Sequence, residues 1–104
     1  MKKIKINIKT KTSNYPIIIG SGLINNLTKI FNDNSIKFSK CLLVIDNKIP
    51  KNFINKVLKS LKNKKKIISY FNASEKNKNI ISTNKILELL LKKNFHRNDC
   101  LISI

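Results

Sequence analysis

The sequence has few of the residues that carry most catalytic and metal chemistry. Its 104 residues include one histidine, five acidic residues, two cysteines, two glycines and no tryptophan. One histidine and no cluster of carboxylates predict no metal site and no nucleophile–base pair. His96 lies among Asn94, Phe95 and Arg97, just before the last apolar run, where a surface loop is the expected structure.

Long apolar runs are also absent, and the cysteines are isolated. The longest runs, such as residues 41–45, are far shorter than the roughly 18–20 residues of a membrane span. The basic start leads into alternating Ile and Lys instead of the apolar stretch of a signal peptide. Cys41 and Cys100 each lie in an apolar run and form no CxxC pair. We expect a cytoplasmic protein, without membrane contact, whose two thiols are reduced and in the core.

Arginine is nearly missing, although the formal net charge is +17. The basic residues are 21 lysines and Arg97, whereas base readout and bidentate phosphate contacts favour arginine. Ile, Asn and Lys, whose codons consist almost wholly of A and T, make up 56 of the 104 residues. We interpret the charge as base-composition drift and expect no specific nucleic-acid partner. A lysine-rich nucleic-acid-binding module is the alternative, and it predicts steeply salt-dependent binding.

The start of the chain predicts an antiparallel hairpin and a helix. Isoleucine at every second position gives residues 3–9 one apolar face, and residues 15–19 follow a polar turn. Pro16 places the second strand near an edge, because proline lacks a backbone N–H. Apolar residues at three- and four-residue spacing then predict an amphipathic helix over residues 23–31.

The middle of the chain predicts two strand–helix units. Residues 41–45 are apolar on both faces, which is typical of a parallel strand covered by helices, and Pro50 suits the first turn of the next helix. A second strand over residues 67–71 is followed by a polar loop and a second helix. We expect the apolar side chains of both helices to face inward: Phe53, Ile54, Val57, Leu58 and Leu61 in the first, and Ile80, Ile81, Ile86, Leu87, Leu90 and Leu91 in the second.

Residues 100–104 predict one more buried strand. Repeated strand–helix units favour right-handed crossovers. We therefore predict a Rossmann-like three-layer α/β domain over residues 1–104, with a largely parallel sheet and an N-terminal β-hairpin. In such folds ligand phosphates bind in the loop after a central strand, and the sequence stops before one. We expect an incomplete nucleotide-binding domain, whose uncovered apolar surface favours aggregation or a homodimer.

Two segments are candidate binding residues at the carboxyl edge of this sheet. Asp46 ends the first parallel strand, where a carboxylate can accept hydrogen bonds from both hydroxyls of a cofactor ribose. It can equally form a turn or cap the next helix. In the loop after the next strand, Glu75 and Lys78 are three residues apart and can project to one side. They can clamp a cofactor or form an exposed ion pair of about 0–1 kcal/mol.

Four segments, taken in order and spacing, resemble the N-terminal domain of 3-dehydroquinate synthase. They are YPIIIGSGL from Tyr15, LVIDN from Leu43, SExxK from Ser74 and RNDxLIxI from Arg97. The resemblance spans nearly all of this sequence but roughly the first third of such an enzyme.

The resemblance implies an NAD-dependent, zinc- or cobalt-assisted lyase of the shikimate pathway, which leads to chorismate and the aromatic amino acids. Its substrate is 3-deoxy-D-arabino-heptulosonate 7-phosphate, which is cyclised with loss of phosphate to 3-dehydroquinate. By position, Asp46 would face the adenosine ribose of NAD, and Glu75 and Lys78 would lie along the cofactor. Ser74 belongs to the same loop and stands where the family usually has glycine, which allows a closer approach of the backbone.

Much of the family's machinery has no counterpart in these 104 residues. In the family a triple-glycine loop for the pyrophosphate follows the strand that matches residues 99–104. The metal ligands and the substrate-binding lysines and arginines belong to a C-terminal helical domain. We therefore expect no catalytic or metal-binding residue here, no synthase activity of this chain alone, and weak or absent NAD binding. A related sugar-phosphate cyclase or polyol dehydrogenase is a further alternative.

Overall fold

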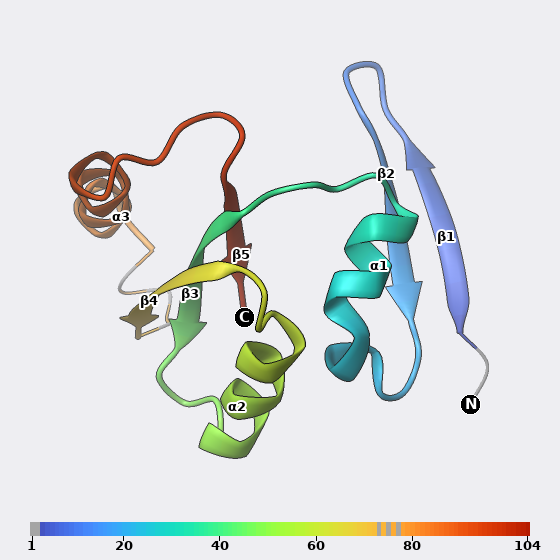
Figure 1. Ribbon diagram of the computed structural model, residues 1–104. Coiled ribbons are helices and arrows are strands. Elements are labelled where there is room, and N and C mark those ends of the chain that lie inside the picture. Colours follow the sequence, from blue (N-terminus) through green and yellow to red (C-terminus); the bar gives the residue numbers. More distant parts are fainter. Residues whose placement is uncertain (1–2, 73, 75, 77) are drawn as a thin grey trace.

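A three-stranded parallel sheet lies at the centre of the computed structural model, which describes residues 3–72, 74, 76 and 78–104 (Figure 1). Its strands are β3 (Lys40–Asp46), β4 (Lys65–Phe71) and β5 (Cys100–Ser103), in the order β4-β3-β5. In the register Leu42 lies opposite Ile67 of β4 and Leu101 of β5. The predicted α/β fold with a parallel sheet is confirmed.

The hydrophobic core is built around β3. Cys41, Leu42, Leu43 and Ile45 are completely buried, as expected for a central parallel strand. One face of β3 packs against α2 (Lys51–Ser60), whose buried residues are Ile54 and Val57, together with Leu61 just beyond the helix.

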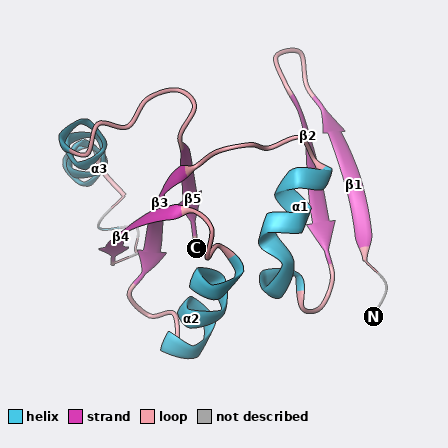
Figure 2. Cartoon of the chain, viewed as in Figure 1, coloured by secondary structure: helices cyan, strands magenta, loops and turns pink. Residues whose placement is uncertain are grey.

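Helix α3 (Ile80–Lys92) connects β4 to β5 and covers the other face of the sheet. The crossover through α2 leads from β3 to β4, and the one through α3 leads back past β3. Two right-handed crossovers in opposite directions place their helices on opposite faces. Figure 2 shows α2 and α3 on different sides of the three strands.

The predicted hairpin is also present, beside α1 (Figure 1). Strands β1 (Ile4–Lys9) and β2 (Asn14–Ile19) are antiparallel, with Ile4 opposite Ile19 and Ile8 opposite Tyr15. Paired residues share a face, so one face of the hairpin is apolar. Most of that face is exposed, including Ile4, Ile6, Tyr15, Ile17 and Ile19.

The helix expected over residues 23–31 is divided in two. A 3-10 helix (Leu23–Asn26) follows Gly22, which has a φ of 71°, and α1 (Leu27–Asp33) begins where the first segment ends. The backbone N–H of Leu27 donates to Ser60 Oγ at 2.7 Å. This N–H bonds to the last residue of α2, so it is not available for a hydrogen bond to a carbonyl of the preceding 3-10 helix. The α-helix therefore starts anew at Leu27.

The expected burial of several apolar residues is wrong. In α3 only Ile86, Leu89 and Leu90 among the large apolar residues are partly buried, and β5 is a half-exposed edge strand. The exposed residues are Ile80, Ile81, Leu87, Leu91 and Leu101, together with Phe53 in α2. The apolar surface of α3 is wider than the strip that the narrow three-stranded sheet covers.

Candidate functional site

The candidate site lies at the carboxyl edge of the sheet, where the ends of all three strands are bonded together. The N–H of Asp46 donates to the carbonyl of Ile104, which follows β5, at 2.9 Å. The N–H of Asn47 donates to the carbonyl of Phe71, the last residue of β4, at 2.9 Å. The loops that follow β3 and β4 therefore begin side by side.

Asp46 is partly exposed and stabilises its own turn. Its Oδ1 atom accepts a hydrogen bond from the N–H of Lys48 at 3.2 Å, which is the Asx-turn pattern. A carboxylate has about four acceptor positions, so this bond leaves capacity for the two hydroxyls of a ribose. The turn-forming and ribose-binding interpretations are therefore compatible.

The loop after β4 leads from this edge to the start of α3. Ser74, Lys76 and Lys78 are exposed, whereas Glu75 lies outside the described residues. Asn79 caps α3, because its Oδ1 atom accepts from the N–H of Ser82 at 3.0 Å. Its Nδ2 atom donates to the carbonyl of Lys76 at 3.1 Å, which ties the loop to the helix.

Sequence reasoning missed two polar residues of α3 beside this loop. Ser82 and Lys85 line a cavity of about 270 Å³ together with Asn72, at the end of β4. The signal was present in the sequence, because Asn79, Ser82 and Lys85 follow one another at three-residue spacing and so share one helix face.

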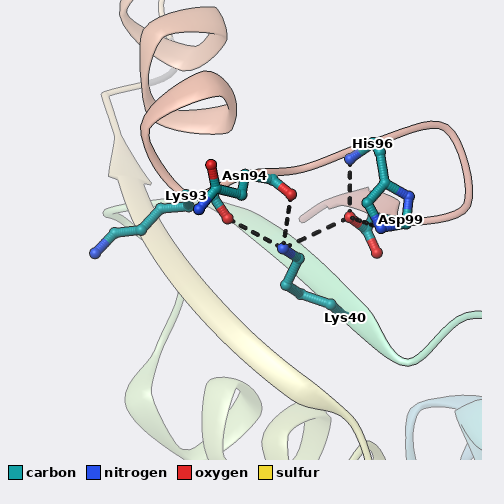
Figure 3. A network of polar contacts seen from close by, with 5 residues as sticks. All are labelled: Lys40, Lys93, Asn94, His96 and Asp99. Carbon is teal, nitrogen blue, oxygen red and sulfur yellow. Dashed lines mark hydrogen bonds and ion pairs between the residues drawn. The ribbon is translucent and has the colours of Figure 1, made fainter.

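His96 belongs to a different site, at the opposite end of β3 (Figure 3). Asp99 Oδ2 accepts from the backbone N–H of His96 at 2.9 Å, lies 3.7 Å from His96 Nε2, and also lies 3.7 Å from Lys40 Nζ. Lys40 begins β3 and Asp46 ends it, so the two sites are six residue steps apart along the strand, about 20 Å. His96 is exposed in a surface loop, as its sequence position predicts.

Lys40 closes the end of α3 in this network. Its Nζ atom donates to the carbonyls of Lys93 and Asn94, both at 3.0 Å, and lies 4.5 Å from the centre of the Phe95 ring. These two carbonyls directly follow Lys92, the last residue of α3, and a lysine is favourable at the negative end of the helix dipole. The geometry indicates a structural role.

The two cysteines lie directly opposite each other on β3 and β5 and are both free. Burial raises the pKa of the Cys41 thiol above its ordinary value, and the neighbouring Cys100 raises that pKa further. Burial also raises the pKa of Cys100. Both groups are therefore protonated thiols at neutral pH, which are poor nucleophiles and poor metal ligands.

Within the described part of the chain, no group of three or more His, Cys, Asp or Glu residues could hold a metal ion. Nor is any helix among those residues long and apolar enough to cross a membrane. These residues therefore do not fit the zinc or cobalt site that the resemblance implies.

Sequence comparison identifies relatives over the entire chain. The chain is 53% identical over 104 residues to the 3-dehydroquinate synthase of Pelagibacter ubique, and 32% identical over 108 aligned residues to that of Blochmanniella floridana. This chain is similar throughout to part of 3-dehydroquinate synthase. The predicted resemblance is thereby confirmed. The alignment covers all of the chain and 28% of each relative. No protein-family model matches the sequence.

Two solved structures share the fold. The crystal structure of 2-deoxy-scyllo-inosose synthase aligns with the present chain at a TM-score of 0.76 and 12% identity. The alignment covers 94% of the present chain and 28% of the synthase chain. The complex of that synthase with carbaglucose-6-phosphate, NAD+ and Co2+ matches with a TM-score of 0.74 and 12% identity. At this identity the likeness shows a common fold and nothing about the ligands of the present chain.

Proposed function

We propose that residues 1–104 form the NAD-binding part of a 3-dehydroquinate synthase, whose substrate is 3-deoxy-D-arabino-heptulosonate 7-phosphate. The observation that carries the proposal is the 53% identity over the whole chain to a curated 3-dehydroquinate synthase. The position of Asp46 beside the loop after β4 adds support, because in open α/β sheets cofactors bind outside the carboxyl ends of the strands.

Each candidate residue then has a chemical task. The Asp46 carboxylate accepts hydrogen bonds from the two ribose hydroxyls, and each charge-assisted bond contributes about 1.5–3 kcal/mol. Ser74, Glu75 and Lys78 lie along the cofactor in the loop after β4. When bound, NAD would supply a hydride acceptor for transient oxidation of a substrate hydroxyl. The metal ligands, the pyrophosphate loop and the substrate-binding residues would come from elements other than these.

The proposal extends to partners and location. The substrate is a sugar phosphate, which this chain does not turn over alone. The exposed apolar face of the hairpin and the exposed edge strand β5 favour a homodimer. The protein works in the cytoplasm. The sequence relatives do not favour a nucleic-acid-binding module. They also favour 3-dehydroquinate synthase over a related cyclase, since the 2-deoxy-scyllo-inosose synthases are only 12% identical.

An NMR titration of the 104-residue chain with NAD tests the cofactor role. Because the pyrophosphate loop is missing, we expect a dissociation constant of about 1 mM or weaker. The backbone amide shifts should change at residues 46–48 and 72–79. Asp46→Asn should abolish these NAD-induced changes. The matched variant Asp33→Asn, which alters an exposed carboxylate of α1, should leave the changes intact.

Two results would contradict the proposal. One is an absence of shifts at this edge with millimolar NAD while the fold is intact by circular dichroism. The other is turnover of the heptulosonate phosphate by the 104-residue chain, measured as phosphate release with NAD and Co2+ or Zn2+, because the missing machinery would then not be needed.

A further inference from the structure

A large cavity lies away from the candidate NAD site, between helices α1 and α2. It is an open groove of about 890 Å³, within the range of about 300–1,000 Å³ typical of ligand sites. Figure 1 shows the two helices beside each other, at one side of the sheet. Helix α2 starts near Asp46 and ends at Ser60, so the groove's Ser60 end lies about 15 Å along the helix axis from that edge.

Residues with polar or charged side chains line both walls of the groove. Leu27 and Phe31 of α1 and Leu58 of α2 pack against the core, as is usual for packed helices, whereas none of the ten residues that line the groove is apolar. Those from the 3-10 helix and α1 are Asn25, Thr28, Lys29, Asn32 and Asp33, and those from α2 and the turn after it are Lys56, Lys59, Ser60, Lys62 and Asn63.

Hydrogen bonds between the two helices fix the base of the groove. Ser60 Oγ accepts from the N–H of Leu27 at 2.7 Å, and Thr28 Oγ1 donates to the carbonyl of Ser60 at 2.7 Å. Both bonds are partly buried. The polar walls are therefore held at a set separation before any ligand arrives, which reduces the entropic cost of binding.

The positive charge of the groove is concentrated on one wall. On the α1 side, Lys29 is paired with Asp33 at 3.0 Å. On the α2 side, Lys56, Lys59 and Lys62 succeed one another at three-residue spacing, and no carboxylate on that wall opposes them. The Cβ atoms of Lys56 and Lys59 are about 5–6 Å apart on the helix, and Lys62 follows in the turn after it. Such a row suits an extended anion better than a single compact one.

We propose that this groove binds an anion with two or three linked phosphate groups. The phosphates lie along Lys56 and Lys59 of α2 and Lys62 of the turn after it, and the amides of Asn25 and Asn32 on the opposite wall donate hydrogen bonds to the remaining oxygens. This site is independent of the NAD site, so its ligand does not compete for Asp46.

Isothermal titration with inorganic tripolyphosphate in about 0.15 M NaCl, where exposed charges are largely screened, tests the proposal. We expect saturable one-to-one binding, with amide shifts confined to residues 25–33 and 56–63. Lys56→Gln/Lys59→Gln should weaken binding by about tenfold or more. The control Lys11→Gln/Lys92→Gln removes the same charge from exposed positions outside the groove and should leave the affinity within about twofold.

Asn32→Ala separates a formed site from general attraction to lysines, because it changes no charge. We expect binding about threefold to tenfold weaker in this variant, from the loss of one solvent-exposed hydrogen bond. Far-UV circular dichroism must be unchanged in every variant that is scored. Asn55→Ala, on α2 outside the groove, should bind normally.

Four outcomes would overturn the proposal. They are equal weakening by the two double-lysine variants, no effect of Asn32→Ala, equal affinity for orthophosphate and tripolyphosphate, and shifts spread over the whole surface. Tighter binding of a short single-stranded RNA, with the same dependence on Lys56 and Lys59, would replace it with a nucleic-acid site. None of these results bears on NAD shifts at residues 46–48.

Discussion

The central strand and the N-terminal hairpin are both rich in apolar residues, yet only one of them makes a core. In β3, Cys41, Leu42, Leu43 and Ile45 have no exposed surface, because strands lie on both sides and helices on both faces. In the hairpin, Ile4 and Ile19 are about half exposed, at 51% and 47%. Similar side chains therefore contribute very different amounts of free energy, set by what surrounds them.

The overall size agrees with this contrast. The Cα radius of gyration is 14.8 Å, whereas a compact domain of this length has about 13 Å. The hairpin and α3 extend away from the core and carry most of the exposed large apolar residues. Among the described residues, every buried one lies between positions 38 and 61, which predicts that stability is concentrated there.

Truncation of one buried and one exposed side chain is the most direct test of this contrast. Leu43→Ala, in the core, should lower the free energy of unfolding by about 3–5 kcal/mol, a large share of the roughly 5–15 kcal/mol of a typical domain. Ile6→Ala, in the hairpin, should lower it by about 1 kcal/mol or less, because its side chain is already 44% exposed. Urea unfolding followed by circular dichroism measures both.

Similar losses for the two variants would contradict the comparison. A large effect of Ile6→Ala would mean that the hairpin face is covered in solution, by a second copy or another partner. Repeating the urea series over a range of protein concentrations separates these cases, since only self-association makes the midpoint depend on concentration.

The parts of the fold that sequence predicted well depend on local pattern. The apolar run of residues 41–45 and the alternation in residues 3–9 are visible within one window, and each forms the expected strand. The position of Asp46 at a sheet edge follows from the same reasoning. The apolar run of residues 41–45 predicts the strand, and Asp46 comes directly after it, at the strand's end.

The parts that failed depend on contacts between distant residues. The amphipathic pattern of α3 indicates that Leu87 and Leu91 prefer burial, but not whether anything covers them, and both are exposed. The division at Leu27 depends on Ser60, 33 residues further on. The groove between α1 and α2 likewise needs two helix faces that only the folded chain brings together, so no window of sequence reveals it.

The Lys40 network sharpens the comparison, because it joins α3 to the core strand. The side chains of Lys40 and Asp99 are 16% and 5% exposed. Lys40→Met nearly keeps the length of the side chain but removes its bonds to the carbonyls of Lys93 and Asn94, just after α3, and its ion pair with Asp99. We expect a loss of about 2–3 kcal/mol, near the value for a broken, mostly buried pair.

The control is Lys29→Met, which breaks the exposed pair with Asp33 and should change stability by about 0.5 kcal/mol or less. Amide hydrogen exchange should also become faster in α3 of the Lys40→Met variant and remain slow in β3. Equal effects of the two lysine variants would show that α3 is not held by this network.

The smallest expected effect concerns pH and again separates the core from the surface. Burial raises the pKa of the Cys41 thiol above its ordinary value of 9.0, with a further contribution from Cys100. Well below that pH the thiol is protonated in both the folded and the unfolded chain, so its titration does not change the free energy of unfolding. Above pH 9.0 the unfolded chain ionises first, and the stability that the protonated thiol allows is lost progressively as the pH rises toward the folded-state pKa.

The measurement is the difference in unfolding free energy between pH 7 and about pH 10, for the unchanged chain and for Cys41→Ala. Lysines and tyrosines titrate in both proteins and cancel in the comparison, so the unchanged chain should lose more stability than the variant. Alkylation of Cys41 by iodoacetamide should also be slower in the folded chain than in urea, because the thiolate is the reactive form. An equal pH dependence in the two proteins would show that Cys41 is not held as a thiol in the core, and the contrast between β3 and the hairpin would lose its chemical signature.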